Sequence, residues 1–205
     1  MRDVSLPAQA PPEAVKEVID FLAPFKNAGS AITDQTAADC GAKAEPLLSA
    51  SWEVAADYCR VLLKWGESPI GDIRSLAIQR VFQVLEFHPR SRDVQEEGSH
   101  AIAILSYPNT CDVIAIDGAS HLRRASFRFP ADINVQREVG WALRCIALRS
   151  DPDRKALLRP LFEDIIRSVR AVHDGCDQVM AYYRLVNKEY DGTLYEQPAA
   201  AVPAE

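Results

Sequence analysis

One stretch of this chain occurs twice, and no other feature restricts the possible folds as much. Residues 94–105 read VQEEGSHAIAIL and residues 135–146 read VQREVGWALRCI, at an offset of 135 − 94 = 41 residues. The aligned pairs, which are identical or apolar on both sides, are Val94/Val135, Gln95/Gln136, Glu97/Glu138, Ala101/Ala142, Ile102/Leu143 and Leu105/Ile146. A register kept over such a distance predicts two copies of one structural unit.

Each copy has the apolar spacing of a helix with one buried face. Its core positions recur at i, i+4, i+7, i+8 and i+11, which lie on one side of an α-helix. They are Val94, Gly98, Ala101, Ile102 and Leu105 in the first copy, and Val135, Val139, Ala142, Leu143 and Ile146 in the second. A unit of about forty residues with one apolar stripe buries that stripe by stacking on copies of itself, as in an α-solenoid.

The remainder of the chain between its two ends also has helical spacing. Apolar residues recur every three or four positions. No segment shows the alternation of polar and apolar residues, flanked by turns, that is typical of a β-hairpin, so the sequence predicts an all-α fold. Helices are expected at residues 12–25, 32–49, 52–65, 70–87, 93–106, 110–116, 118–128, 132–149, 154–172 and 175–188.

The composition is that of a soluble globular protein, with 48% hydrophobic and 25% charged residues. A formal net charge of −6 disfavours nucleic acids and anionic membranes as partners, since both attract basic surfaces. No apolar run approaches the roughly 20 residues that span a bilayer, so no membrane insertion is expected. The first twenty residues do not resemble a leader, which predicts a cytoplasmic protein; nuclear location, or organellar location after removal of a presequence, are the alternatives.

The two ends of the chain are rich in proline and alanine and poor in core-forming residues. We therefore expect an N-terminal tail at 1–11, a helical repeat domain at 12–190 and a C-terminal tail at 191–205. The cysteines, which form no C-x-x-C pair, are expected as small core residues in a reducing compartment: Cys40, Cys59, Cys111, Cys145 and Cys176.

The region around the second copy resembles a known family. Residues 113–148, VIAIDGASHLRRASFRFPADINVQREVGWALRCIAL, look like an armadillo repeat: a short first helix, an Asp-Gly turn, a second helix, a proline-bearing connection and a long third helix. Residues 71–105 are similar, so the resemblance covers about 71–148, and 71–105 and 113–148 are the best repeats. It implies a short right-handed armadillo-like solenoid of about four repeats, with degenerate terminal repeats.

Towards the C-terminus the same helix pattern continues at an offset of 40 residues. The alignment there assigns core positions to Val179, Tyr182, Tyr183 and Val186.

The resemblance also implies a binding surface, because in this family the exposed sides of the third helices line a groove for extended peptides. Trp141 takes the position of the family's groove tryptophan, but Cys145 stands where asparagine is expected, which disfavours nuclear-signal binding of the importin kind. The groove residues implied in the two copies are Glu96, His100, Ile104, Arg137, Trp141 and Arg144. The alternative is that His100 and Trp141 pack between neighbouring third helices.

The stretch LRRASF at residues 122–127 matches the acceptor pattern of basophilic kinases, which makes Ser126 a candidate phosphorylation site. The alternative interpretation places this stretch inside a helix with Leu122, Ala125 and Phe129 in the core. A kinase would then have to unfold that helix first.

No arrangement of residues in the sequence indicates catalysis. The histidines are far apart, no His/Cys spacing suits zinc, and no glycine-rich phosphate loop occurs, so neither metal nor cofactor is predicted. We expect a non-enzymatic protein-protein interaction module, or an accessory subunit of a larger assembly, which binds another protein through the groove. The alternative is a structural subunit attached mainly by its extended termini.

Overall fold

The computed structural model describes residues 10–26, 33–65, 71–107 and 117–195, and these residues form helices and turns without any strand. The predicted all-α fold is therefore confirmed for this part of the chain. The predicted helix at 110–116 and Cys111 lie outside the described residues.

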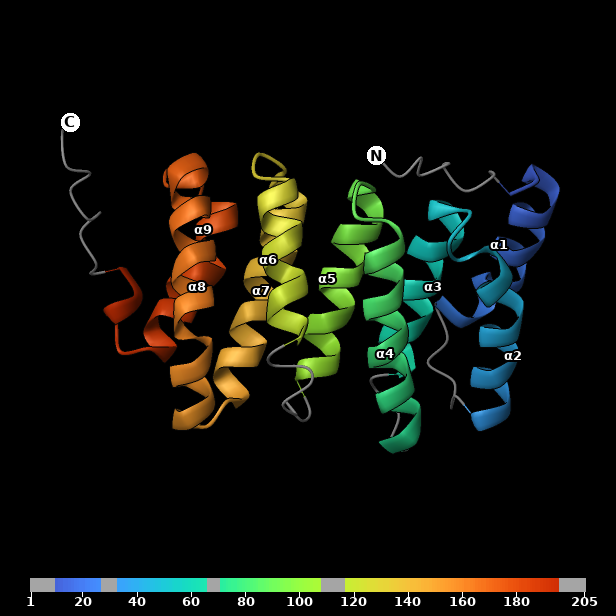
Figure 1. Cartoon of the computed structure of the whole chain (residues 1–205), viewed down its shortest axis with the longest axis horizontal. Helices are drawn as coiled ribbons and strands as arrows, with labels where there is room; N and C mark the ends of the chain where they lie inside the picture. The colour runs from blue at the N-terminus through green and yellow to red at the C-terminus, as the bar shows by residue number, and fades with distance from the viewer. Residues whose placement is uncertain (1–9, 27–32, 66–70, 108–116, 196–205) are drawn as a thin grey trace, which may run out of the picture. The chain divides into compact units, whose positions relative to one another are not determined.

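The helices begin and end within a few residues of the predicted limits. Their bounds are α1 Pro12–Lys26, α2 Asp34–Ala44, α3 Trp52–Trp65, α4 Gly71–Phe87, α5 Arg92–Ser106, α6 Ala119–Arg128, α7 Ile133–Arg149, α8 Pro152–His173 and α9 Asp177–Glu189, with 3₁₀ turns η1 Glu45–Leu47 and η3 Thr193–Tyr195 (Figure 1). The chain divides into two compact units, residues 1–105 and 106–205, which are described separately.

Three long helices begin in the same way, at regular intervals along the chain. Ser51, Ser91 and Asp132 stand before α3, α5 and α7, at spacings of 91 − 51 = 40 and 132 − 91 = 41 residues. Each side chain accepts a hydrogen bond from a backbone amide in the first turn, which otherwise has no partner. The donors are Val54 N to Ser51 Oγ (3.2 Å), Val94 N to Ser91 Oγ (3.4 Å) and Val135 N to Asp132 Oδ1 (3.0 Å).

The predicted core face of both copies is confirmed. All ten positions are buried, including Ile102 at 1% and Leu143 at 0% exposure. In the C-terminal continuation Val179, Tyr183 and Val186 are buried as expected. Tyr182 differs because it is only half-buried and stacks on a side chain of α7.

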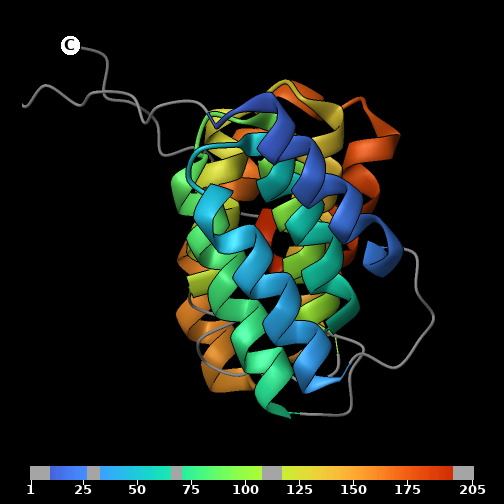
Figure 2. The same cartoon turned by 90° about the vertical axis from the view of Figure 1, so that its right-hand side faces the viewer.

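In the first unit α3 is the central helix and packs against α1, α2 and α4. Figure 2 shows this unit from its α1 and α2 side. The nearly buried carboxylate of Asp57 on α3 receives Lys26 from α1 at 2.7 Å, and Arg60 bridges from α3 to Glu97 on α5 at 2.7 Å. The Lys26–Asp57 pair is nearly buried, whereas Arg60 is largely exposed, so only the first pair is shielded from water.

In the second unit α6 lies beside α8 and α7 lies beside α9 (Figure 1). The α6–α8 pair carries a salt bridge from Arg123 to Asp164 at 2.6 Å. The α7–α9 pair meets at Gly140, where an added Cβ would lie 2.8 Å from Tyr183 Cε2 and 3.1 Å from Tyr182 Cβ. Only glycine permits this approach of the two helices.

A buried glutamine joins two consecutive helices in both copies of the repeat. Gln95 on α5 donates its side-chain amide to the carbonyls of Leu85 and His88, at the end of α4. Gln136 on α7 does the same at the end of α6, with Ser126 and Phe129 as acceptors. Each of the three positions is displaced by 41 residues: 136 − 95, 126 − 85 and 129 − 88. The repeat is therefore present in hydrogen bonds as well as in the apolar pattern.

Two histidines contact a backbone carbonyl of an earlier turn. His88, after α4, has its Nε2 against the carbonyl of Leu48, and His173, at the end of α8, has its Nε2 2.7 Å from the carbonyl of Pro130. The two acceptors lie 130 − 48 = 82 residues apart, which is twice the 41-residue offset, but the histidines lie 173 − 88 = 85 residues apart and so do not keep this register.

The folded chain extends past residue 190, the predicted limit of the repeat domain. Thr193–Tyr195 forms η3, which packs against α8 and α9, with Leu194 buried and Arg159 donating to Thr193 Oγ1 at 2.8 Å. The buried Tyr190 ring lies against Phe162 of α8 with 5.7 Å between ring centroids. Residues just before the Pro/Ala-rich C-terminal end, such as Tyr190, thus pack against α8, which the composition of this end does not indicate.

Cysteines behave largely as predicted, since Cys40, Cys59 and Cys145 are buried and Cys176 is half-buried. Burial raises the pKa of Cys40 and of Cys145 to about 11, which keeps these thiols protonated and unreactive at neutral pH.

The buried leucine of α7 provides a test of the core. Leu143→Ala should lower the free energy of unfolding by about 2–5 kcal/mol, because truncation of a fully buried leucine leaves a cavity. Chemical denaturation followed by circular dichroism measures this. The control is Leu157→Ala on α8, where the leucine is 73% exposed and its loss should change stability little. Equal effects at the two positions would contradict the assigned core face.

The glutamine bridge provides a second test. Gln136→Leu should cost at least about 2 kcal/mol, because it leaves the carbonyls of Ser126 and Phe129 without this donor. The same substitution at Gln178, which is exposed on α9, is the matched control. A variant as stable as the wild type would show that the bridge is dispensable.

Candidate functional site

The three predicted groove residues of α5 lie along one side of that helix. Glu96, His100 and Ile104 follow at four-residue intervals and are all half-buried. Glu96 forms a salt bridge with Arg92 at 2.8 Å. This face thus belongs to the first unit and combines a compensated charge, an imidazole and an aliphatic side chain.

The three predicted groove residues of α7 likewise share a face, in the second unit. Arg137, Trp141 and Arg144 occupy positions i, i+4 and i+7 and are half-buried. The indole of Trp141 stacks on Tyr182 of α9, with 6.4 Å between ring centroids and 27° between ring planes. Trp141 therefore packs against a neighbouring helix and is still partly exposed, so both interpretations of this residue retain support.

The contact between Trp141 and Tyr182 joins two helix faces into one surface, which we name the α7–α9 face. Two exposed leucines extend it, Leu148 at 40% and Leu185 at 38% exposure. Its members are Arg137, Trp141, Arg144 and Leu148 on α7, and Gln178, Tyr182 and Leu185 on α9. Sequence reasoning missed Tyr182 as a surface residue, although two consecutive tyrosines on a helix must point in different directions.

The two arginines of the α7–α9 face differ in their surroundings. Arg137 donates to Glu138 Oε1 at 3.0 Å, so its charge is compensated within α7. The Nε–H of Arg144 is buried and has no hydrogen-bond acceptor among the described residues. An unsatisfied donor of a charged group is rare and costly, which distinguishes Arg144 from its neighbour.

Cys145 does not belong to this face, since it is 2% exposed and faces the core of the unit. The position at which the resemblance leads us to expect asparagine therefore presents no side chain on this face. What this face offers a partner is an aromatic pair, arginine and two leucines.

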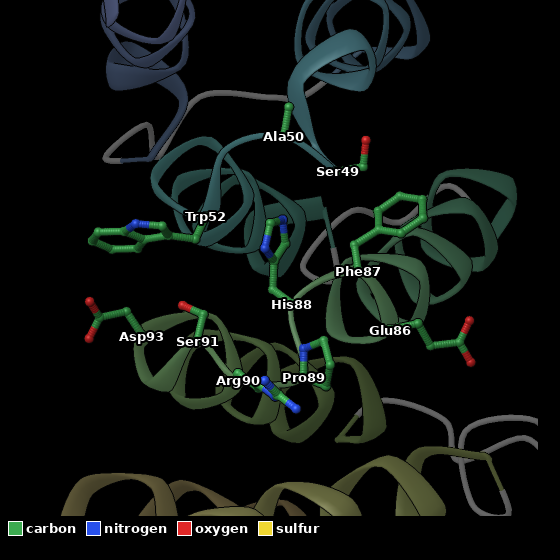
Figure 3. A pocket seen from close by; sticks show the side chains of 10 residues that line it. All are labelled: Ser49, Ala50, Trp52, Glu86, Phe87, His88, Pro89, Arg90, Ser91 and Asp93. Atoms are coloured by element: carbon green, nitrogen blue, oxygen red, sulfur yellow. The ribbon is translucent and has the colours of Figure 1, made fainter. Parts of the chain in front are cut away.

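A separate hollow of about 940 Å³ lies in the first unit, between the turn that precedes α3 and the turn that joins α4 to α5 (Figure 3). His88 lies between the rings of Trp52 and Phe87, which are 44% and 43% exposed. The other lining residues are Ser49, Ala50, Glu86, Pro89, Arg90, Ser91 and Asp93. The walls are mainly apolar, so the hollow suits an apolar side chain of a partner.

A smaller hollow of about 360 Å³ adjoins it and shares Ala50 and Trp52 as lining residues. Sequence analysis did not identify either hollow. The only available signal was that an aromatic residue flanks each of the two turns, as Trp52 follows Ser51 and Phe87 precedes His88.

Ser126 is not accessible in the folded chain. Its exposure is 0%, and its hydroxyl donates to Gln136 Oε1 at 3.0 Å. The expected core positions Leu122 and Ala125 are buried beside it, while Phe129 is half-buried. The candidate phosphorylation site thus forms part of the glutamine bridge.

No group of three or more histidine, cysteine, aspartate or glutamate side chains in the described part of the chain could hold a metal ion. Burial, and then Arg124, lower the pKa of His121 to about 4, so this imidazole is neutral at pH 7. No helix among the described residues is long and apolar enough to cross a membrane. Comparison of the chain with protein-family models, with curated proteins and with solved structures finds no match.

Burial of Ser126 leads to a test of its modification. A basophilic kinase should phosphorylate a free peptide of residues 119–130 at least about tenfold faster than the folded protein, because the kinase needs an extended substrate. Phosphate incorporation measured by mass spectrometry compares the two substrates, with heat-unfolded protein as control. Equal rates on peptide and native chain would show that α6 opens readily.

Proposed function

We propose that this chain is a non-enzymatic protein-binding module built as a short right-handed armadillo-like solenoid, and that it serves as an accessory subunit of a larger protein assembly. The observation that carries the proposal is the duplicated glutamine bridge with its 41-residue offset at Gln95 and Gln136. Two helices that repeat both their apolar face and their polar connections are what a stacked repeat requires.

The proposed binding residues lie on the exposed faces of the two equivalent helices, α5 in the first unit and α7 in the second. They are Glu96, His100 and Ile104 on α5, and Arg137, Trp141 and Arg144 on α7. Trp141 is the best anchor, since large aromatic side chains at the centre of an interface contribute most to binding energy. Its stacking on Tyr182 supports this role, because a fixed indole loses little conformational freedom when a partner covers it.

The second candidate function is attachment through the Pro/Ala-rich termini, with the helices acting as structural material. The observation that favours it is composition, since residues 1–9 and 196–205 contain little that could contribute to a core. In either case we propose a protein partner, no cofactor and a cytoplasmic location.

Binding measurements on matched variants distinguish the two functions. The partner is first identified by native purification of the chain from its source, and its affinity for each variant is then measured with purified proteins. The double change His100→Ala with Trp141→Ala should weaken binding by at least about 2 kcal/mol, or about 30-fold, with helicity almost unchanged. Leu157→Ala, on an exposed leucine outside this surface, is the control and should bind normally.

Deletion of residues 1–9 and 196–205 tests the alternative without touching η3 or α1. If the tails attach the protein, this deletion abolishes binding and the double change does not. If the double mutant unfolds, Trp141 is a core residue; Trp141→Phe, which keeps a ring against Tyr182, then decides whether this position also contacts the partner.

A further inference from the structure

The structure assigns a chemical class to the partner: we infer that the α7–α9 face binds an acidic protein segment, whose carboxylate pairs with Arg144 while an adjacent apolar side chain covers Trp141 and Tyr182. This inference rests on the proposed binding function, and it adds the charge and character of the ligand. It depends on the surroundings of Arg144, on the charge of the face and on its exposed apolar groups.

Arg144 is exceptional among the arginines of the second unit. Six others have a carboxylate oxygen within 3.3 Å: Arg123 with Asp164, Arg137 with Glu138, Arg154 with Asp151, Arg159 with Glu163, Arg170 with Asp174, and Arg184 with Asp177. The remaining four, Arg124, Arg128, Arg149 and Arg167, are exposed, so water can satisfy their donors. Arg144 is half-buried, and its Nε–H has neither water access nor an acceptor among the described residues.

A guanidinium in this condition favours a carboxylate ligand. Its Nε and one Nη form an edge that matches the two oxygens of a carboxylate, and such bidentate pairs are among the strongest hydrogen bonds in proteins. In the unbound chain the buried Nε–H has lost its hydrogen bonds to water without gaining an acceptor, which costs free energy. A modest rotation of the side chain towards a carboxylate bound on the face would give this donor an acceptor and remove that cost. Arg137 would gain less from an external carboxylate, because Glu138 already accepts hydrogen bonds from its guanidinium.

The charge of the face agrees with an acidic partner. Arg137 pairs with Glu138, so the charge that this face offers a ligand is that of Arg144, on a chain with a formal net charge of −6. The nearby carboxylates of α9 already have partners, since Asp177 pairs with Arg184 and Glu189 with Lys155. A cationic face on an acidic protein selects against basic segments and attracts acidic ones.

The apolar groups of the face define what must accompany the carboxylate. Trp141 and Tyr182 form a stacked pair, and Leu148 and Leu185 are exposed nearby on the same helix faces. Aromatic and aliphatic groups exposed together beside one cation mark a protein interaction surface. The fitting ligand is an aspartate or glutamate next to a leucine-like or aromatic residue.

A displayed library of random 12-residue peptides, selected on the full-length protein, tests the inference. Enriched peptides should share an acidic residue beside an apolar one. Synthetic copies of two of them should bind Arg144→Gln at least about 10-fold more weakly than wild type. Arg167→Gln, which removes an exposed arginine of α8, is the control and should bind within about 2-fold of wild type.

Two further measurements separate pairing from a structural effect. Replacement of the peptide's acidic residue by its amide should weaken binding to wild type but change binding to Arg144→Gln little. Arg144→Gln should also melt at or above the wild-type temperature, because it removes an unsatisfied buried donor.

Enriched peptides without a shared acidic residue, no enrichment at all, or undiminished binding to Arg144→Gln would overturn the inference. Peptides that need Trp141 but not Arg144 would leave the proposed binding function intact and remove only the acidic ligand. Loss of native-partner binding only in the protein lacking both tails would instead contradict the proposed function itself.

Discussion

The hydrogen bonds of a buried glutamine amide are the interaction on which the connection between consecutive helices depends. A helix ends with carbonyls that have no partner inside the helix, and these carbonyls must find donors when the next helix covers them. Gln95 and Gln136 supply the donors from the first turn of the following helix, so one side chain both closes a helix and fixes the turn after it. A shorter or apolar residue at either position would remove the side-chain donor to the carbonyls of Leu85 and Ser126, while those of His88 and Phe129 would keep the backbone amides of Ser91 and Asp132.

The helices could be predicted from the sequence because their apolar residues recur with the period of an α-helix. Periodicity depends only on which residues avoid water, so the ten core positions of the two copies could be read directly, and Ile102 and Leu143 are indeed buried. The end of the folded region was predicted less well because Tyr190 and Leu194 find their contacts on α8, far back in the chain. Such contacts depend on tertiary structure, which a local pattern does not contain.

The candidate surfaces were less predictable than the core. Pattern analysis placed Arg137, Trp141 and Arg144 on one helix face, but it could not show that Arg137 has an internal partner and that Arg144 has none. It also treated Tyr182 as a core residue, because alignment transfers burial from one helix to another without accounting for neighbours. The hollow lined by Trp52, Phe87 and His88 arises where two turns meet, and turns have no periodicity that reveals a shared cavity.

The glycine at the crossing of α7 and α9 has a consequence for recognition. Because Gly140 has no side chain, Tyr183 and Tyr182 lie directly against the backbone of α7, and the hydroxyl of Tyr183 donates to the carbonyl of Gln136 at 3.0 Å. The two helices therefore pack closely beneath the stacked rings of Trp141 and Tyr182. A ligand that binds to these rings contacts a surface that is already ordered. This protein then loses little conformational entropy on association, and most of that loss occurs in the ligand.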